Sequence, residues 1–311
     1  MDSGIFRREN EGGQEAEEES AMPMSELPRD FLIEPQPTEA DFQIPDDAER
    51  LTRPKKPQTI KKIGEIASKL ETNPNATQYL LLTDVSVSLR KYLLNERIRG
   101  LRFTFDDRKI LLRIMPSGQH ECVIGQFTLS FGDAMTAAGL PSSGERWLAT
   151  NARELAGLNC SKQPDFSIIP RSHPNSTFVS KWPSLVVEVG MSQSKNSLRN
   201  DAQWWYSNSN YHTRLILLFK VHKGTPFRVD VELWSAPIVP QSRVTRQGGK
   251  PLLSLTQELR VTQDAVTLVK GSSPDIKLDY KLLMRENGQG DITITQKMLQ
   301  RACQDVRELD A

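Results

Sequence analysis

The chain has 311 residues, of which 37% are hydrophobic and 25% charged, with a formal net charge of +1. This composition is typical of a globular protein of one or two domains. No stretch approaches the roughly 18 apolar residues that a membrane-spanning helix needs, and the first ten residues lack the apolar core of a secretory signal. The three cysteines are widely separated and form no C-x-x-C pair, which argues against a zinc knuckle or a disulfide framework. We therefore expect an intracellular protein, nuclear or cytoplasmic, with no membrane partner.

The charge is unevenly distributed along the chain. Residues 1–50 hold 15 acidic and 4 basic residues, whereas the remainder holds 24 acidic and 36 basic residues. A basic body attracts polyanions such as nucleic acid. Ordinary surface charge is an equal alternative, because net charge alone does not show that the basic side chains cluster.

The N-terminal part is expected to consist of a disordered tail followed by a helical region. Residues 1–58 hold a run of glutamates and seven prolines, which predicts a disordered acidic tail and linker. Apolar residues at helical spacing predict a first helix from Thr59 and a second helix over 78–96. Residues 59–98 would then be a helical N-terminal region, serving either as a small adaptor or as padding on the main domain.

Residues 99–311 are predicted to form one α/β domain. Strands are expected over 101–105, 109–115, 166–169, 184–189, 215–221 and 227–234, with helices over 121–138, 198–207 and 296–308. The run 184–189 is nearly all apolar, which is typical of a strand that is covered on both faces.

Two acidic residues stand out against these strands. Asp165, after Pro164, opens one strand, and Glu188 lies near the end of the next, followed by Val189 and Gly190. If the strands are neighbours, the two carboxylates converge at one edge of the sheet. Such a pair suits Mg²⁺, which prefers oxygen ligands. A bound Mg²⁺ lowers the pKa of a coordinated water and stabilises charge on a phosphate undergoing hydrolysis.

These segments resemble the PD-(D/E)xK restriction-endonuclease-like superfamily, whose nuclease members carry Pro-Asp on one strand and Glu-x-Lys on the next. Within it, the chain is most similar to a bacterial restriction-endonuclease family and to related fungal proteins. The segments that carry the resemblance are 162–165, 182–190, 192–194 and 198–205, with a weaker continuation over 290–292. The resemblance implies a restriction-endonuclease-like mixed sheet flanked by helices, and Mg²⁺-dependent cleavage of nucleic acid.

The resemblance also implies a set of metal ligands. Asp165 and Glu188 would bind the metal. A further carboxylate is placed at Asp106 by matching the Met-Pro pair at 115–116 and His120, with Asp107 as a rival and a simple loop acid as the alternative. His120 itself is interpreted as a turn or capping residue.

The superfamily's lysine is missing, because position 190 is glycine. Where the lysine migrates to the neighbouring helix, this chain has Gln203, which can orient water but carries no charge. Lys162 and Lys195 are substitutes from adjacent segments, and the simpler interpretation makes them solvated lysines. The tryptophans at 204 and 205 are expected to pack the helix on the sheet, with base stacking as the alternative.

Three functions remain open from the sequence. The first is a Mg²⁺-dependent nuclease whose catalytic competence is in question without the lysine. The second is a catalytically inactive nuclease-fold protein whose nucleic-acid binding would survive Asp165→Ala. The third is a protein-interaction module whose acidic tail contacts a basic partner. The fold alone does not choose among them, because function belongs to the site.

Overall fold

The computed structural model describes residues 44–73, 76–95, 100–105, 108–114, 118–140, 145–151, 153–157, 160–171, 180–191, 193–237, 252–288 and 290–308. All of these belong to one unit of the chain, Glu34–Ala311. Of the predicted disordered tail, residues 1–43 lie outside the described residues. The prediction is wrong for the segment that follows, which contains strand β1 (Glu49–Thr52) and the start of helix α1 (Lys56–Thr72).

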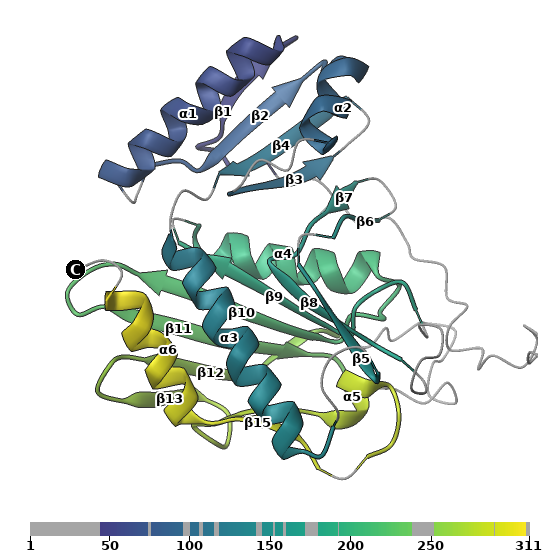
Figure 1. Ribbon diagram of the computed structural model, residues 1–311, viewed down its shortest axis with the longest axis vertical. Coiled ribbons are helices and arrows are strands. Elements are labelled where there is room, and N and C mark those ends of the chain that lie inside the picture. Colours follow the sequence, from purple (N-terminus) through teal and green to yellow (C-terminus); the bar gives the residue numbers. More distant parts are fainter. Residues whose placement is uncertain are drawn as a thin grey trace, which may run out of the picture. The chain divides into compact units, whose positions relative to one another are not determined.

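The first sheet is built mainly from residues 49–114. Its strands run in the order β1, β2 (Tyr79–Thr83), β4 (Lys109–Ile114), β3 (Leu101–Phe105), β7 (Ser161–Lys162) and β6 (Leu155–Ala156). Strand β1 is parallel to β2, and the other pairings are antiparallel. Helix α1 and the short helix α2 (Val87–Asn95) pack on this sheet, and their apolar residues share one core with the strands (Figure 1).

The predicted second helix, 78–96, is wrong in its first part. Residues Tyr79–Thr83 form a strand that pairs with β4, and helix α2 begins only at Val87. Between them the chain bends at Asp84, which adopts a left-handed conformation with a φ of 52°. Pairing of β2 with β4 therefore joins residues on both sides of the domain boundary expected at residue 98.

The second sheet carries the acidic residues of interest. Its strand order is β13 (Val266–Lys270), β12 (Ser254–Val261), β11 (Arg228–Ser235), β10 (Leu215–His222), β9 (Leu185–Gly190), β8 (Phe166–Pro170) and β5 (Trp147–Thr150). Strands β9 and β10 are parallel, and all other neighbours are antiparallel. Helix α4 (Lys195–Asn208) connects β9 to β10, as a parallel pair requires a crossover.

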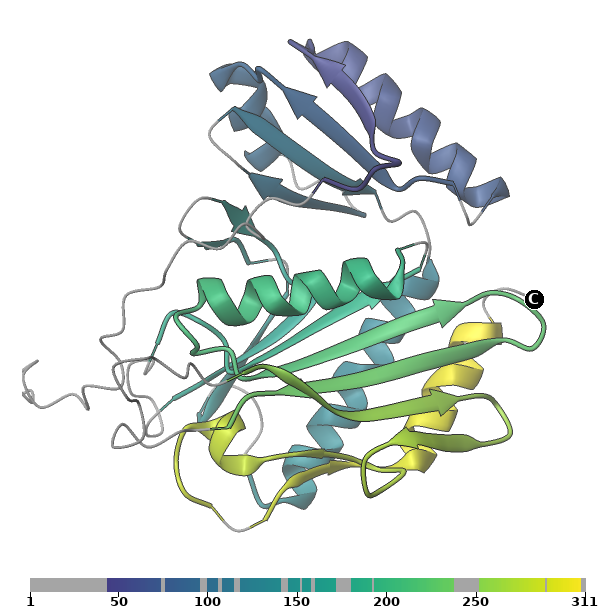
Figure 2. The same ribbon diagram turned by 180° about the vertical axis from the view of Figure 1, so that it is seen from behind.

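Helices cover both faces of the second sheet. Helices α3 (Gly118–Ala137) and α6 (Gln296–Glu308) lie on one face, and α4 lies on the other (Figures 1 and 2). Along β9 the side chains alternate, so that Val187 packs into the core under α3 and Val186 into the core under α4. The same alternation places Glu188 on the face covered by α4. Short elements β14 (Ile276–Leu278), α5 (Tyr280–Met284) and β15 (Ile292–Ile294) extend the α3 and α6 core.

The expected α/β class is confirmed, with a mixed sheet that is flanked by helices. The predicted helix 296–308 matches α6, and the predicted strands 184–189, 215–221 and 227–234 correspond to β9, β10 and β11. Strands β12 to β15 were not among the predicted elements. Within the described ranges, no helix combines the length and apolar character needed to cross a membrane.

Candidate functional site

The structure brings Asp165 and Glu188 together. Strands β8 and β9 are antiparallel neighbours, with Phe166 opposite Val187. Asp165 stands just before β8, where its Oδ2 accepts a hydrogen bond from the backbone N–H of Val189 at 2.8 Å. Both acidic residues are buried: the exposed fraction is 0% for Asp165 and 3% for Glu188. Two buried carboxylates at one position require compensating positive charge.

That charge comes from Arg113, on strand β4 of the first sheet. Its Nη2 lies 2.9 Å and 3.0 Å from the two carboxylate oxygens of Asp165 and 3.1 Å from Oε2 of Glu188. A single guanidinium nitrogen thus lies within hydrogen-bond distance of both carboxylates. Its Nη1 donates to Oε1 of Gln193 at 3.2 Å. Arg113 itself is buried, and it was not among the residues predicted from the sequence.

Three further side chains place nitrogen atoms next to the two acidic residues. Arg102, on β3, places Nε 3.3 Å from Oδ1 of Asp165. His120 places Nε2 3.1 Å from Oδ2 of the same residue. The indole N–H of Trp205 donates to Oε1 of Glu188 at 2.8 Å. The interpretation of His120 as a turn or capping residue is wrong, because it lies within α3, fully buried beside Asp165.

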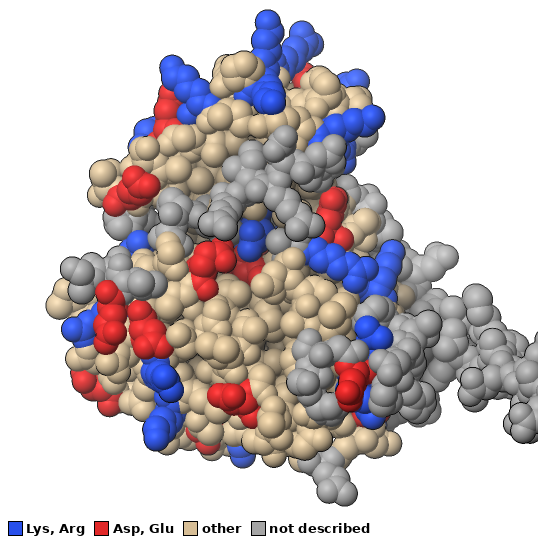
Figure 3. Space-filling view, viewed as in Figure 1, with Lys and Arg blue, Asp and Glu red and all other residues tan. Residues whose placement is uncertain are grey.

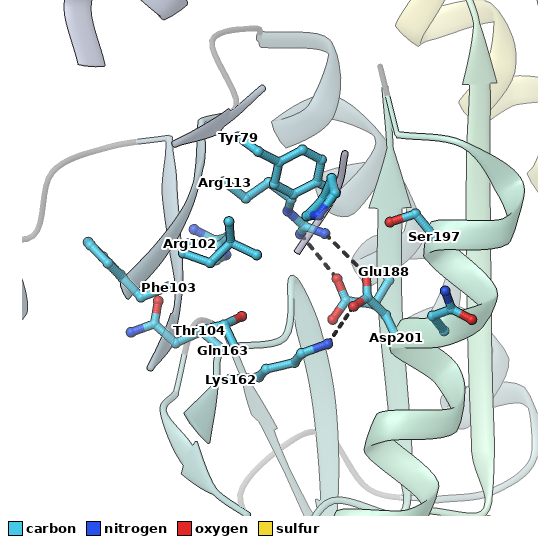
Figure 4. Close-up of a pocket in the computed structure, with 13 residues that line it drawn as sticks. Tyr79, Arg102, Phe103, Thr104, Arg113, Lys162, Gln163, Glu188, Ser197 and Asp201 are labelled. Atoms are coloured by element: carbon cyan, nitrogen blue, oxygen red, sulfur yellow. Dashed lines mark hydrogen bonds and ion pairs between the residues drawn. The ribbon is translucent and has the colours of Figure 1, made fainter. Parts of the chain in front are cut away.

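A second layer of polar contacts surrounds Arg113. Oδ2 of Asp201, on α4, lies 3.9 Å from Nη1 of Arg113 and accepts a hydrogen bond from Nε2 of Gln193 at 2.7 Å. Lys162, at the end of β7, donates to Oδ1 of Asp201. Figure 4 shows Arg113 pointing toward Glu188, with Lys162 reaching Asp201 from the opposite side. Asp201 therefore holds both cations, and the sequence-based prediction had missed it.

The charges shift the pKa values of the two carboxyl groups in opposite directions. Burial alone would raise the pKa of Asp165, but Arg113 and His120 hold it well below its usual range. Burial and the neighbouring charge of Asp165 raise the pKa of Glu188 above its ordinary value. Burial would lower the pKa of Arg113, but the two carboxylates raise it further above its usual range. Arg113 is therefore a permanent cation.

His120 also responds to Asp165. Its burial would lower the pKa of the imidazole, but the adjacent carboxylate more than offsets this, so that the pKa of His120 is raised from 6.5. The charged imidazole is therefore stabilised next to Asp165.

The packing of a neighbouring side chain explains why position 190 is a glycine. A Cβ at Gly190 would lie 2.7 Å from Cδ1 of Leu198, a buried residue of α4. Side chains alternate along β9, so position 190 lies on the same face as Glu188, the face that is covered by α4. A lysine in the Glu-x-Lys pattern would point toward this helix. Close packing of α4 on the strand therefore fills the space of the missing lysine.

Two of the predicted substitutes lie elsewhere. Nζ of Lys195 lies 3.0 Å from Asp230 and 3.1 Å from Glu258, on strands β11 and β12. Gln203 is half-buried on α4 and lies two residues from both Asp201 and Trp205, which places it on the opposite side of the helix.

The other predicted residues divide as follows. Lys162 reaches the site through Asp201. Asp106 and its rival Asp107 lie outside the described residues. Both tryptophans are buried, so their predicted packing role is confirmed, and Trp205 adds the hydrogen bond to Glu188.

The carboxylates in this arrangement do not fit a Mg²⁺ ion. The ion requires several oxygen ligands with near-octahedral geometry, whereas the oxygens of Asp165 and Glu188 face N–H groups. Among the described residues, no group of three or more His, Cys, Asp or Glu side chains could hold a metal. The cation between the carboxylates is the guanidinium of Arg113.

A small pocket opens beside this cluster. Its volume is about 60 Å³, enough for a few water molecules but not for a nucleotide. The lining residues that matter for the site are Tyr79, Arg102, Arg113, Lys162, Glu188 and Asp201 (Figure 4). Burial raises the pKa of the Tyr79 hydroxyl, so this group remains a neutral donor.

Comparison with solved structures gives a distant likeness. No family model matches the chain, and neither does any curated protein. A structural match is the crystal structure of a "putative nuclease belonging to DUF820" from Anabaena variabilis, with 11% sequence identity and a TM-score of 0.39. The match covers 69% of this chain and 98% of the other.

Proposed function

We propose that this chain is a nuclease-fold protein that binds nucleic acid and does not cleave it by a metal-dependent reaction. The observation that supports this most strongly is Arg113, whose Nη2 contacts Asp165 and Glu188 at 2.9 Å and 3.1 Å. In a nuclease, this position between the two carboxylates would be taken by the metal.

Arg113 can replace the charge of a metal but not its chemistry. A guanidinium remains protonated at any physiological pH, so it cannot transfer a proton to or from water. It has no vacant coordination position at which to lower the pKa of a bound water. The lysine that would orient the water has no counterpart at Gly190, and Lys162 is held by Asp201.

The charge distribution supports a polyanionic partner. Residues 44–114 hold 15 basic and 9 acidic residues. In Figure 3 the Lys and Arg side chains gather over helix α1, at the top of the view. Several are paired, since Lys62 and Lys69 both contact Glu49, so the excess of positive charge is moderate. Such a surface favours contacts with phosphates that do not depend on base sequence.

A metal-dependent nuclease is the second candidate. It is favoured by the convergence of Asp165 and Glu188 next to a pocket. This function would require Arg113 to leave both carboxylates, which would leave two buried negative charges for the metal to neutralise. A protein-interaction module is the third candidate and predicts no affinity for nucleic acid.

Cleavage and binding assays separate the three. Plasmid DNA, single-stranded DNA and RNA are incubated with Mg²⁺ or Mn²⁺ and either the wild type or Glu188→Gln, and binding of labelled oligonucleotides is measured in EDTA by fluorescence anisotropy. We expect no metal-dependent cleavage by either protein, and binding that persists in EDTA. Cleavage by the wild type alone would establish the nuclease instead. Absence of binding at moderate salt would leave the protein-interaction module.

A further inference from the structure

A second polar pocket lies at the hairpin between β10 and β11. Its volume is about 480 Å³. Four of its nine lining residues are basic and none is acidic. The basic residues are Lys220, His222, Lys223 and Arg228, and the others are Met191, Val221 and residues 224–226. A hollow lined in this way favours an anionic ligand.

Few carboxylate groups lie close enough to neutralise the basic side chains of this pocket. Nζ of Lys220 donates to the backbone oxygen of Met191, and burial lowers the pKa of this lysine to about 8. His222 and Arg228 contact Asp230, with Nε2 at 2.9 Å and Nε at 3.7 Å.

Asp230 is itself shared among further cations. This carboxylate, only 3% exposed, also faces Lys195 at 3.0 Å and Arg260 at 3.4 Å. This carboxylate thus contacts three cations, Lys195, Arg228 and Arg260, besides His222, whose pKa is lowered by burial. The pocket is lined by Lys220, Lys223 and Arg228 and by no carboxylate, so it keeps a positive excess.

The end of β9 and the residues that follow it connect this pocket to the Asp165–Glu188 centre. Gly190, the last residue of β9, pairs with Lys220 of β10. In the segment that follows, Met191 accepts the hydrogen bond from Lys220 on the pocket side. Gln193 accepts the hydrogen bond from Arg113 at the buried centre. The pocket therefore lies at the same end of β9 as Glu188.

We propose that this pocket binds a phosphate group of a nucleic-acid backbone, so that a bound strand passes across the end of β9. The inference rests on the proposed function and assigns it a contact site. Lys and Arg side chains with adjacent backbone groups are the usual partners of phosphate oxygens in such complexes. Contacts of this kind fix the position of the strand and make binding dependent on salt.

The test is the binding of a labelled oligonucleotide to the full chain at several salt concentrations. The variant is Lys223→Gln with Arg228→Gln. The matched control is Lys277→Gln with Lys297→Gln, two exposed lysines that do not line the pocket. Both doubly substituted proteins lose the same charge, and their thermal unfolding is compared first to show that both fold.

We expect the pocket variant to bind at least about tenfold more weakly than the control, and the slope of log K against log salt to fall by about 2 for duplex DNA. Equal affinities of variant and control, with a wild type that binds, would overturn the pocket and leave the proposed function standing. A wild type that binds no nucleic acid at any salt concentration would overturn both.

Discussion

Nη2 of Arg113 lies 2.9 Å and 3.0 Å from the two carboxylate oxygens of Asp165, and the contact joins the first sheet to the second. Arg113 lies on β4 and Asp165 precedes β8, so the ion pair links strands of different sheets. The same guanidinium also donates to Glu188, the second acidic residue, at 3.1 Å. One buried side chain of the first sheet therefore contacts both acidic residues of the second.

Removing Arg113 should destabilise the protein strongly. Arg113→Met leaves Asp165 and Glu188 buried without their main partner, and breaking a buried ion pair in this way costs about 3–5 kcal/mol. Urea denaturation measures the free energy of unfolding. Arg50→Met, at an exposed position, is the control and should change this free energy by less than about 0.5 kcal/mol. Similar effects of both substitutions would contradict the central role of Arg113.

The indole N–H of Trp205 should contribute more to the free energy of unfolding than that of Trp204. Trp205→Phe removes the N–H that donates to Glu188 at 2.8 Å, whereas Trp204→Phe removes a donor to Sγ of Cys160 at 3.0 Å. Both variants lose the same volume from the same core. The difference between their free energies of unfolding therefore compares the two hydrogen bonds. We expect Trp205→Phe to cost about 0.5–1.5 kcal/mol more, because a thiol sulfur is a weaker acceptor than a carboxyl oxygen. No difference would mean that Glu188 does not depend on this donor.

The His120 contact should make stability dependent on pH. The pKa of His120 is raised in the folded protein, so the protonated imidazole stabilises the fold fully below its ordinary pKa of 6.5. That contribution is lost as the pH rises through the folded-state pKa. Asp165, whose pKa is lowered, stays ionised over the same range.

Comparison of the wild type with His120→Gln checks the direction of this pH dependence. The free energy of unfolding lost on substitution should be larger at pH 6 than at pH 8.5. Urea denaturation at both values measures it, and a loss that grows toward pH 8.5 would show that the imidazole is neutral beside Asp165.

Close packing at Gly190 predicts that substitutions at Gly190 and Leu198 have coupled effects on the free energy of unfolding. Gly190→Ala places a Cβ 2.7 Å from Leu198, and such overpacking typically costs about 1–3 kcal/mol. In a Leu198→Ala background the neighbouring side chain is shortened, so Gly190→Ala should cost less. A double-mutant cycle measures the coupling, and strictly additive effects would refute the packing explanation. Gly190→Lys should accordingly fail to introduce metal-dependent cleavage.

Local patterns in the sequence were sufficient to predict the central strands and the convergence of the acids. The apolar run of β9 and the alternation of β11 predicted the strands, and the position of Asp165 and Glu188 at strand ends predicted that they meet. Strand β2 was missed because its leucines continue a helical spacing into α2. Only its pairing with β4, a contact between residues distant in sequence, decides in favour of a strand.

The cation of the site was missed because spacing around the acids does not reveal a partner from another sheet. One signal was present in the sequence. Arg113 follows Ile110, Leu111 and Leu112 and precedes Ile114, so it is a charged residue that interrupts an apolar run. A charge buried there needs an acidic partner. The Lys195 prediction followed proximity in sequence to Glu188, whereas α4 turns this side chain toward Asp230.

The claim that Arg113 takes the place of a metal is tested most directly by thermal unfolding with and without Mn²⁺ or Mg²⁺. A ligand that binds only the folded protein raises the Tm. The account predicts that neither ion shifts the Tm of the wild type beyond the shift seen with Glu188→Gln. A rise in Tm in the wild type that Glu188→Gln abolishes would show that a metal reaches the carboxylates, and would contradict the account.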